Sequence, residues 1–154
     1  MKKNPHGLSF TAKYNSITRI LLTNVYIESP INNNRIEAKA IWDTGASQSL
    51  IRPEIAKKLD LKPVSKTLMS TPSGKGIQSN VYSIYVHLPN GARIVNVFAL
   101  EGIPNICDML IGMDIISLGD FAITNNNGKS MFSFRIPSMA EIDFTKHSYI
   151  QQLN

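Results

Sequence analysis

The strongest constraint on the fold of this chain is an apolar β-strand that is followed directly by an aspartate. Over residues 36–42, apolar and polar side chains alternate with the two-residue period of a half-buried β-strand. The apolar face is made of Ile36, Ala38, Ala40 and Trp42. The strand delivers Asp43 into a turn of small residues, Thr44-Gly45-Ala46-Ser47. The segment therefore predicts a β-sheet with a carboxylate fixed at its edge.

Period-two alternation and turn signals recur along the rest of the chain. Further strands are expected over residues 17–28, 82–88, 94–100, 121–124 and 131–134. Pro89-Asn90-Gly91 joins two of these segments, and Asn125-Asn126-Asn127-Gly128 joins another two, so each turn predicts a β-hairpin. Most of the chain is therefore expected to be strand.

Helix is expected in two short places. Pro53 suits the first turn of a helix that continues through Leu59, and another helical turn or two is expected over Met113–Leu118. Neither segment has room for the strand-helix-strand unit of a cofactor-binding fold. We predict an all-β domain over residues 8–137, followed by a polar C-terminal tail over residues 138–154.

The composition fits one packed soluble domain, because 43% of the 154 residues are hydrophobic and 18% are charged. The net charge of +5 comes from scattered Lys and Arg residues, without a zinc spacing or an aromatic-basic RNA signature, so no nucleic-acid partner is expected. No stretch approaches a membrane span, and the basic start is not followed by an apolar run. We therefore expect a cytoplasmic protein without a membrane partner.

The cysteine and histidine residues do not suggest a reactive or metal-binding set. Cys107 is the only cysteine, which excludes an intrachain disulfide, and its apolar neighbours favour a small buried side chain. His6, His87 and His147 are far apart in dissimilar contexts, and His87 is expected at the surface. We therefore expect no metal ion and no cofactor.

The segment Asp108–Ile116 forms a second informative pattern. Leu110 and Ile111 precede Gly112, and a short helical pattern follows. A buried strand whose glycine packs against another backbone explains this order. By itself Asp-Thr-Gly is a weak signal, since an aspartate that caps its own β-turn is the structural alternative.

Together, the two segments resemble the retropepsin family of retroviral and retroviral-like aspartic proteases. In that family, two hydrophobic residues and Asp-Thr-Gly-Ala are followed by a hydrophobic-hydrophobic-Gly strand and a helix. The resemblance covers residues 36–118 and implies a small closed β-barrel that forms a two-fold homodimer. It implies that Asp43 is the catalytic acid, that Thr44 interlocks the two active-site loops, and that Gly45 is the loop glycine.

The same resemblance assigns a substrate cover to the glycine-punctuated stretch Ser70–Gln78. The family places there a hairpin flap that closes over an extended peptide. Substrate contacts are expected from Ala46, Ser47, Ser73, Gly74, Lys75 and Gly76. An ordinary hairpin turn is the alternative for this stretch.

The chain holds one such acidic loop, whereas the chemistry of this family needs two carboxylates. Two neighbouring carboxylates share one proton, so the charged member takes a proton from water while the neutral member donates to the peptide carbonyl. The resemblance thus implies an aspartic endopeptidase that acts on peptides or proteins as a homodimer. A catalytically silent peptide-binding dimer of the same fold is the alternative. Ala46 lacks a hydroxyl beside the acid, which predicts a working pH less acidic than that of pepsin-like relatives.

The chain departs from the viral pattern in three ways. Met113 stands where viral enzymes carry an arginine that pairs near the active-site loop. Trp42 is bulkier than the usual residue before the acid. The chain also continues through the hairpin over residues 121–134, whereas viral chains end soon after the helix and build their dimer interface from their termini.

Overall fold

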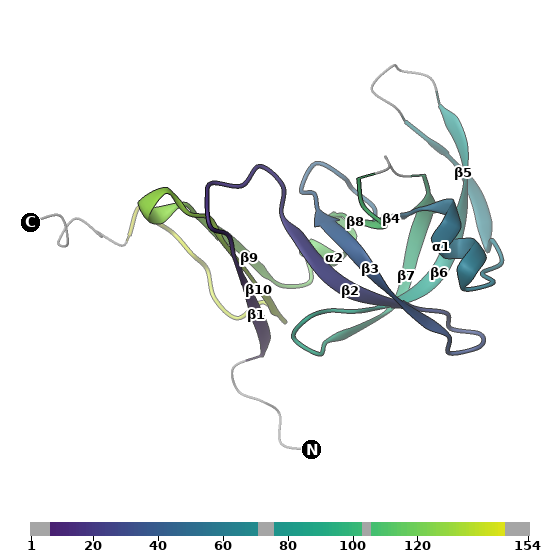
Figure 1. Cartoon of the computed structure of the whole chain (residues 1–154), viewed down its shortest axis with the longest axis horizontal. Helices are drawn as coiled ribbons and strands as arrows, with labels where there is room; N and C mark the ends of the chain where they lie inside the picture. Colours follow the sequence, from purple (N-terminus) through teal and green to yellow (C-terminus); the bar gives the residue numbers. More distant parts are fainter. Residues whose placement is uncertain (1–6, 71–75, 103–105, 147–154) are drawn as a thin grey trace, which may run out of the picture.

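The described part of the chain is built mainly from β-strands (Figure 1). The computed structural model describes residues 7–70, 76–102 and 106–146. The strands are β1 (Leu8–Lys13), β2 (Leu22–Glu28), β3 (Arg35–Trp42), β4 (Leu50–Ile51), β5 (Ser65–Met69), β6 (Ile77–His87), β7 (Arg93–Glu101), β8 (Met109–Ile111), β9 (Asp120–Thr124) and β10 (Met131–Ile136). The helices are α1 (Pro53–Lys58), α2 (Met113–Ile116) and the short 3-10 helix η1 (Asn126–Gly128). No helix within these ranges is long and apolar enough to cross a membrane.

Most of the strands close into a barrel. Neighbouring strands follow the order β2-β3-β8-β4-β7-β6, and β6 also pairs with β2, so these six strands of the described chain form a ring. β5 extends the sheet from β6 as a hairpin that reaches the upper right of Figure 1. The predicted fold, a closed β-barrel with two short helices, is confirmed.

Apolar alternation places one face of the β2–β3 hairpin against the core. Ala38 and Trp42 of β3 are 1% and 4% exposed, whereas Lys39 between them is exposed. Val25 and Ile27 of β2 are buried in the same way. Each buried Val or Ile side chain contributes about 1.5–3 kcal/mol relative to an exposed one. The hairpin that ends at Asp43 is therefore firmly anchored.

A second sheet lies beside the barrel, at the left of Figure 1. Its order is β1-β10-β9, and both outer strands pair antiparallel with β10. We call it the terminal sheet, because it joins strands from both ends of the described chain, with Leu8 paired to Ile136. Aromatic rings attach it to the barrel. Trp42 contacts Phe10, Phe121, Phe132 and Phe134 with ring centroids 5.8, 6.3, 5.1 and 4.8 Å away.

Local sequence signals placed most of the elements correctly. The hairpins β6–β7 and β9–β10 and the helices α1 and α2 are confirmed. The expectation of a strand from residue 17 was wrong, because β2 begins at Leu22. The Tyr14 hydroxyl donates to the Leu22 carbonyl at 3.2 Å and accepts the Leu22 N–H at 3.1 Å. Side-chain hydrogen bonds thus replace a strand ladder where the chain crosses from the terminal sheet to the barrel.

Candidate active site

Asp43 lies immediately after β3, on the loop that joins β3 to β4, which we call the acidic loop. Its N–H donates to the Ile111 carbonyl at 2.9 Å, beside the parallel pairing of β3 with β8. The Gly45 N–H donates to Asp43 Oδ1 at 2.8 Å, and the Ala46 N–H donates to the Asp43 carbonyl at 3.3 Å. Asp43 is half-buried, and no ion pair reaches it from any described residue. The carboxylate is therefore oriented by backbone groups.

Close approach to this carboxylate explains the glycine at position 45. A Cβ on residue 45 would lie 3.1 Å from Asp43 Oδ1, which is tighter than ordinary van der Waals contact. A side chain there would crowd the oxygen that accepts the Gly45 N–H. Thr44 is exposed beside it. The structure brings the three expected catalytic residues together, and their roles stay predictions.

Gly112 lets β8 and α2 approach the acidic loop. A Cβ on residue 112 would lie 2.6 Å from the Gln48 carbonyl carbon and 2.9 Å from the Ala46 carbonyl oxygen. The Met113 N–H donates to that Ala46 oxygen at 2.8 Å. The expected packing of this glycine against another backbone is confirmed. Met113 supports the loop through its main chain, at the position where the viral pattern has an arginine side chain.

A buried hydrogen-bond network holds the end of the acidic loop. Ser49 is 0% exposed, and its hydroxyl and N–H donate to Asp114 Oδ1 and Oδ2 at 2.8 and 3.1 Å. The Ser49 hydroxyl also accepts the Gly112 N–H at 3.1 Å. Sequence reasoning missed Ser49 and Asp114. The sequence did contain a signal for Asp114. It is an acid in the first turn of a short helix that begins directly after the strand glycine.

A hollow of about 380 Å³, which we call the cleft, separates the acidic loop from β5. Its walls are formed by Gly45, Ala46, Ser47, Gln48, Leu50, Thr67, Leu68, Met69, Ser70 and Leu100. β5 and β6 form an antiparallel hairpin in which Met69 is paired with Ile77. The structure therefore places a hairpin across the cleft from the acidic loop.

The expected substrate-binding residues fall into three groups. Ala46 and Ser47 line the cleft. Gly76 is exposed and directly precedes β6. Ser73, Gly74 and Lys75 lie outside the described residues. The substrate-binding role of all six residues stays a prediction.

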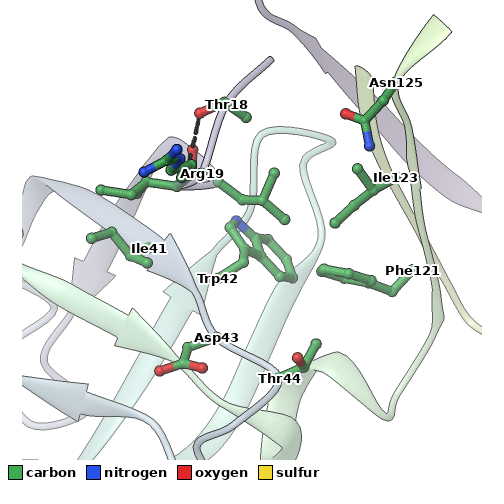
Figure 2. A pocket seen from close by; sticks show the side chains of 11 residues that line it. Thr18, Arg19, Ile41, Trp42, Asp43, Thr44, Phe121, Ile123 and Asn125 are labelled. Atoms are coloured by element: carbon green, nitrogen blue, oxygen red, sulfur yellow. Dashed lines mark hydrogen bonds between the residues drawn. The ribbon is translucent and has the colours of Figure 1, made fainter. Parts of the chain in front are cut away.

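A second hollow, of about 470 Å³, is lined by Asp43 itself (Figure 2). We call it the groove. It is lined by Thr18, Arg19, Ile20, Leu21, Ile41, Trp42, Asp43, Thr44, Phe121, Ile123 and Asn125. Figure 2 shows the Trp42 indole between β9, which carries Phe121, and the segment of Thr18 and Arg19. The acidic loop therefore borders two hollows, one toward β5 and one toward β9.

The cysteine and the described histidine serve the fold. Cys107 is 4% exposed, and burial raises the pKa of its thiol, which makes it a weak nucleophile near neutral pH. His87, predicted at the surface opposite the apolar face of its strand, is partly exposed, and its Nε2 lies 2.5 Å from Glu28 Oε2. Within the described ranges, no three His, Cys, Asp or Glu side chains are grouped to hold a metal ion.

The closed barrel, the acidic loop and the β5–β6 hairpin define a protein with the retropepsin fold. It matches the crystal structure of a retropepsin-like aspartic protease from Rickettsia conorii with a TM-score of 0.54 and 18% identity, over 88% of this chain and 99% of that chain. It matches the EIAV protease complexed with the inhibitor HBY-793 with a TM-score of 0.50 and 21% identity, over 68% of this chain and 90% of that chain. At these identities, the likeness shows the fold.

Residues 27–117 match the model of the family described as "gag-polyprotein putative aspartyl protease". The chain belongs to this family of retropepsin-like aspartyl proteases. The matched range contains the acidic loop and α2, whereas the strands of the terminal sheet lie outside it. A comparison with curated proteins gave no match.

Proposed function

We propose that this protein is an aspartic endopeptidase that works as a homodimer, with one Asp43 from each copy in a shared site. The observation that carries the proposal is the Asp43 carboxylate, held by the Gly45 N–H at 2.8 Å on a loop that borders the cleft. An acid oriented by backbone groups, with no cation paired to it among the described residues, keeps its charge available to a water molecule. Membership of an aspartyl protease family supports the same chemistry.

Two such carboxylates a few ångströms apart hold one proton between them, because both cannot stay charged cheaply. The charged carboxylate takes a proton from the attacking water, whose oxygen bonds to the peptide carbonyl carbon. The neutral carboxylate donates its proton to the carbonyl oxygen. The C–N bond then breaks as a proton passes to the leaving nitrogen, which gives a carboxylic acid and an amine. The pair returns to its one-proton state.

The cleft favours an extended peptide that presents an apolar side chain. Leu50 and Leu100, which are paired in parallel strands, give one wall of the cleft an apolar surface. Met69 on the β5–β6 hairpin adds to it. Successive side chains of an extended peptide point to opposite sides, so every second residue faces this wall. We expect preferred cleavage near residues of the size of Leu, Met or Phe.

The proposal is tested by mass-spectrometric cleavage of a diverse peptide mixture from mildly acidic to neutral pH. Wild type is compared with Asp43→Asn at a concentration at which both are dimeric. The substitution keeps the shape of the side chain and its acceptor for the Gly45 N–H, and it removes the acid. Cuts made by the wild type alone would support the protease, and their sequences would report the preference of the cleft.

Two other outcomes contradict the proposal. Equal cutting by both proteins would identify a contaminating protease. No cutting by a folded dimer would favour a peptide-binding module of the same fold, because a cleft can bind an extended peptide without hydrolysing it.

A further inference from the structure

We propose that a polypeptide substrate is also bound outside the cleft, by an apolar trough on the outer face of β7 that takes up a segment distant from the cleaved bond. The inference rests on the proposed function, because it names the substrate class of that site. This class is an unfolded protein segment longer than the cleft can hold. The trough is defined by Gln48, Val64, Val95, Phe98 and Leu118.

Two hollows continue the cleft along β7. The first, of about 570 Å³, shares Gln48, Thr67 and Leu100 with the cleft. The second, of about 290 Å³, shares Gln48 and Phe98 with the first. Because neighbouring hollows have walls in common, a peptide that leaves the cleft past Gln48 enters the trough next.

A β-bulge turns Phe98 toward the trough. The pairing of β7 with β6 is irregular between Ile94 and Val97, and Asn96 has a φ of 56°. Strict alternation from the buried Ile94 would turn Phe98 into the barrel. Instead, Val97 is buried and Phe98 is 52% exposed, because the extra residue of the bulge shifts the alternation. Asparagine tolerates the left-handed conformation at this point better than most residues. The bulge therefore gives the outer face of β7 a large aromatic side chain.

The trough exposes apolar side chains from three separate segments. Val95 of β7 is 50% exposed, Val64 before β5 is 55% exposed, and Leu118 after α2 is 43% exposed. Exposed apolar side chains that line one surface mark sites of interaction. Phe98 lies where the two hollows join, and aromatic side chains contribute much of the free energy at protein interfaces. Phe98 is therefore the expected anchor.

Continuity with the cleft indicates that the occupant is the substrate itself. Leu100 lines the cleft and Val95 lines the far end of the trough, so the path between them along β7 is about 17 Å at about 3.3 Å per residue. About five residues of an extended peptide cover this length. Of the described residues that line the two hollows, Lys66 and Asp114 are charged, and Asp114 is bound by Ser49. The trough therefore favours apolar side chains, with an acidic one beside Lys66.

Cleavage of casein, an unfolded protein, tests the trough. The cut sites of the wild type and of Phe98→Ser are read by mass spectrometry with long flanks on each side of the bond. Wild-type cuts are expected to carry apolar residues within about five positions beyond the cleft, on one side of the bond. Phe98→Ser should lose this enrichment. Phe144→Ser is the matched control and should keep it, because Phe144 is 67% exposed after β10 and does not line the trough.

Two synthetic peptides made from the best casein site separate the trough from the cleft. The short peptide holds only the residues that reach the cleft, and the long peptide adds the distal apolar segment. The wild type is expected to cleave the long peptide with a kcat/KM about tenfold higher, mainly through a lower KM, which is the scale of one buried aromatic contact. Phe98→Ser should cleave the two peptides equally, and Phe98→Leu should recover part of the difference.

Binding measured without cleavage makes the test independent of the protease. Fluorescein-labelled casein is titrated with the wild type and Phe98→Ser, and with Asp43→Asn and Asp43→Asn/Phe98→Ser, and its anisotropy reports the dissociation constant. Loss of Phe98 is expected to weaken binding about tenfold in both pairs. Denaturant unfolding checks that Phe98→Ser folds, and Val95→Ser repeats the test if it does not.

Each outcome decides between the two claims. If casein is cut but neither cutting nor binding depends on Phe98 or on peptide length, the trough is wrong and the protease stands. If Phe98→Ser weakens casein binding by a chain that never cuts, the trough stands and the protease is wrong. A chain that neither cuts nor binds casein overturns both. If Phe98→Ser changes only the sedimentation of the protein, the outer face of β7 is a contact between copies and the inference is wrong.

Discussion

Each end of the β2–β3 hairpin carries a carboxylate, and the two have opposite surroundings. At one end, Glu28 Oε1 accepts a hydrogen bond from Arg93 Nη2 at 2.6 Å, and Glu28 Oε2 lies 2.5 Å from His87 Nε2. At the other end, Asp43 accepts the Gly45 N–H, and no ion pair among the described residues reaches it. Among the described residues, Glu28 is therefore paired with basic side chains and Asp43 is not.

The difference separates an acid that serves the fold from an acid that is available for chemistry. The hydrogen bond with His87 lowers the pKa of Glu28 most, and Arg93 lowers it further, against the opposing effect of burial. The charge of Glu28 is thereby used to join β2, β6 and β7. No described residue gives Asp43 such a cation, so its charge is not balanced by an ion pair within the described part of the chain. The two ends of one hairpin therefore serve different purposes.

Asp43→Asn should give the largest effect and sharpen this comparison. We expect cleavage to fall by at least about 10³-fold, because the amide cannot take or give the proton. The free energy of unfolding should change by less than about 0.5 kcal/mol, because Asn keeps the acceptor for the Gly45 N–H. Denaturant unfolding and peptide cleavage on the same sample measure both quantities. A large loss of stability would place Asp43 with Glu28 as a structural acid.

Asp114 is an intermediate case, since it positions the acidic loop through Ser49. Asp114→Ala leaves the buried hydroxyl and N–H of Ser49 without their acceptor, so the free energy of unfolding should fall by about 1–3 kcal/mol. kcat should fall more than KM rises, because the loop loses its position. Asp114→Asn should recover part of both, since its amide oxygen still accepts one hydrogen bond. Equal losses in the two variants would assign the effect to charge and contradict positioning by hydrogen bonds.

Acid should weaken the terminal sheet through Asp120. Hydrogen bonds from the Ser138 hydroxyl and the Met139 N–H, together with Arg135, lower its pKa from 3.8 to about 2. Because the folded pKa is the lower one, the stabilisation is complete above about pH 4 and is lost as pH falls through 2, with a total of about 2 kcal/mol. Urea unfolding at several pH values within this window measures the loss. Asp120→Asn should flatten the pH dependence, and an unchanged slope in this variant would contradict the assignment.

Glu28→Gln should give the smallest effect, on stability alone. Its partner Arg93 has a side chain that is 45% exposed, so solvent screens the pair. The thermal midpoint should fall below that of the control Glu37→Gln, whose residue is exposed on β3. Because the pKa of Glu28 is lowered in the folded protein, its contribution to stability is complete above pH 4.5, the ordinary pKa of a glutamate. This contribution is lost as the pH falls through the pKa of the folded state. Cleavage per folded dimer should not change, and a loss of cleavage at unchanged stability would break the comparison.

Sequence alone predicted the features that depend on local pattern. The alternation of β3, the turns of the two hairpins, and the proline that begins α1 are each encoded within a few neighbouring residues. The strand glycine was predicted as well, because a short apolar strand that ends in Gly112 requires close backbone packing. The part of the site that surrounds Asp43 was therefore accessible from the sequence.

The features that sequence reasoning missed depend on partners far along the chain. β1 is a short run whose pairing partner, β10, lies near the other end of the described chain, so its own sequence gave little signal. Ser49 and Asp114 meet through folding alone, as do Glu28 and His87. The pairing of His87 with Glu28 was missed for the same reason, because alternation says which face of a strand a residue occupies and not which acid lies beside it on the neighbouring strand.

The pairing of β1 with β10 also has a consequence for the order in which the chain can fold. Ribosomes make β1 first and β10 last among the described strands, so β1 waits without its partner while the barrel strands emerge. The terminal sheet, and with it the paired form of β9, forms only after β10 has been made. In a growing chain, Trp42 therefore lacks its ring contacts with Phe121, Phe132 and Phe134 until the last of the described strands have emerged.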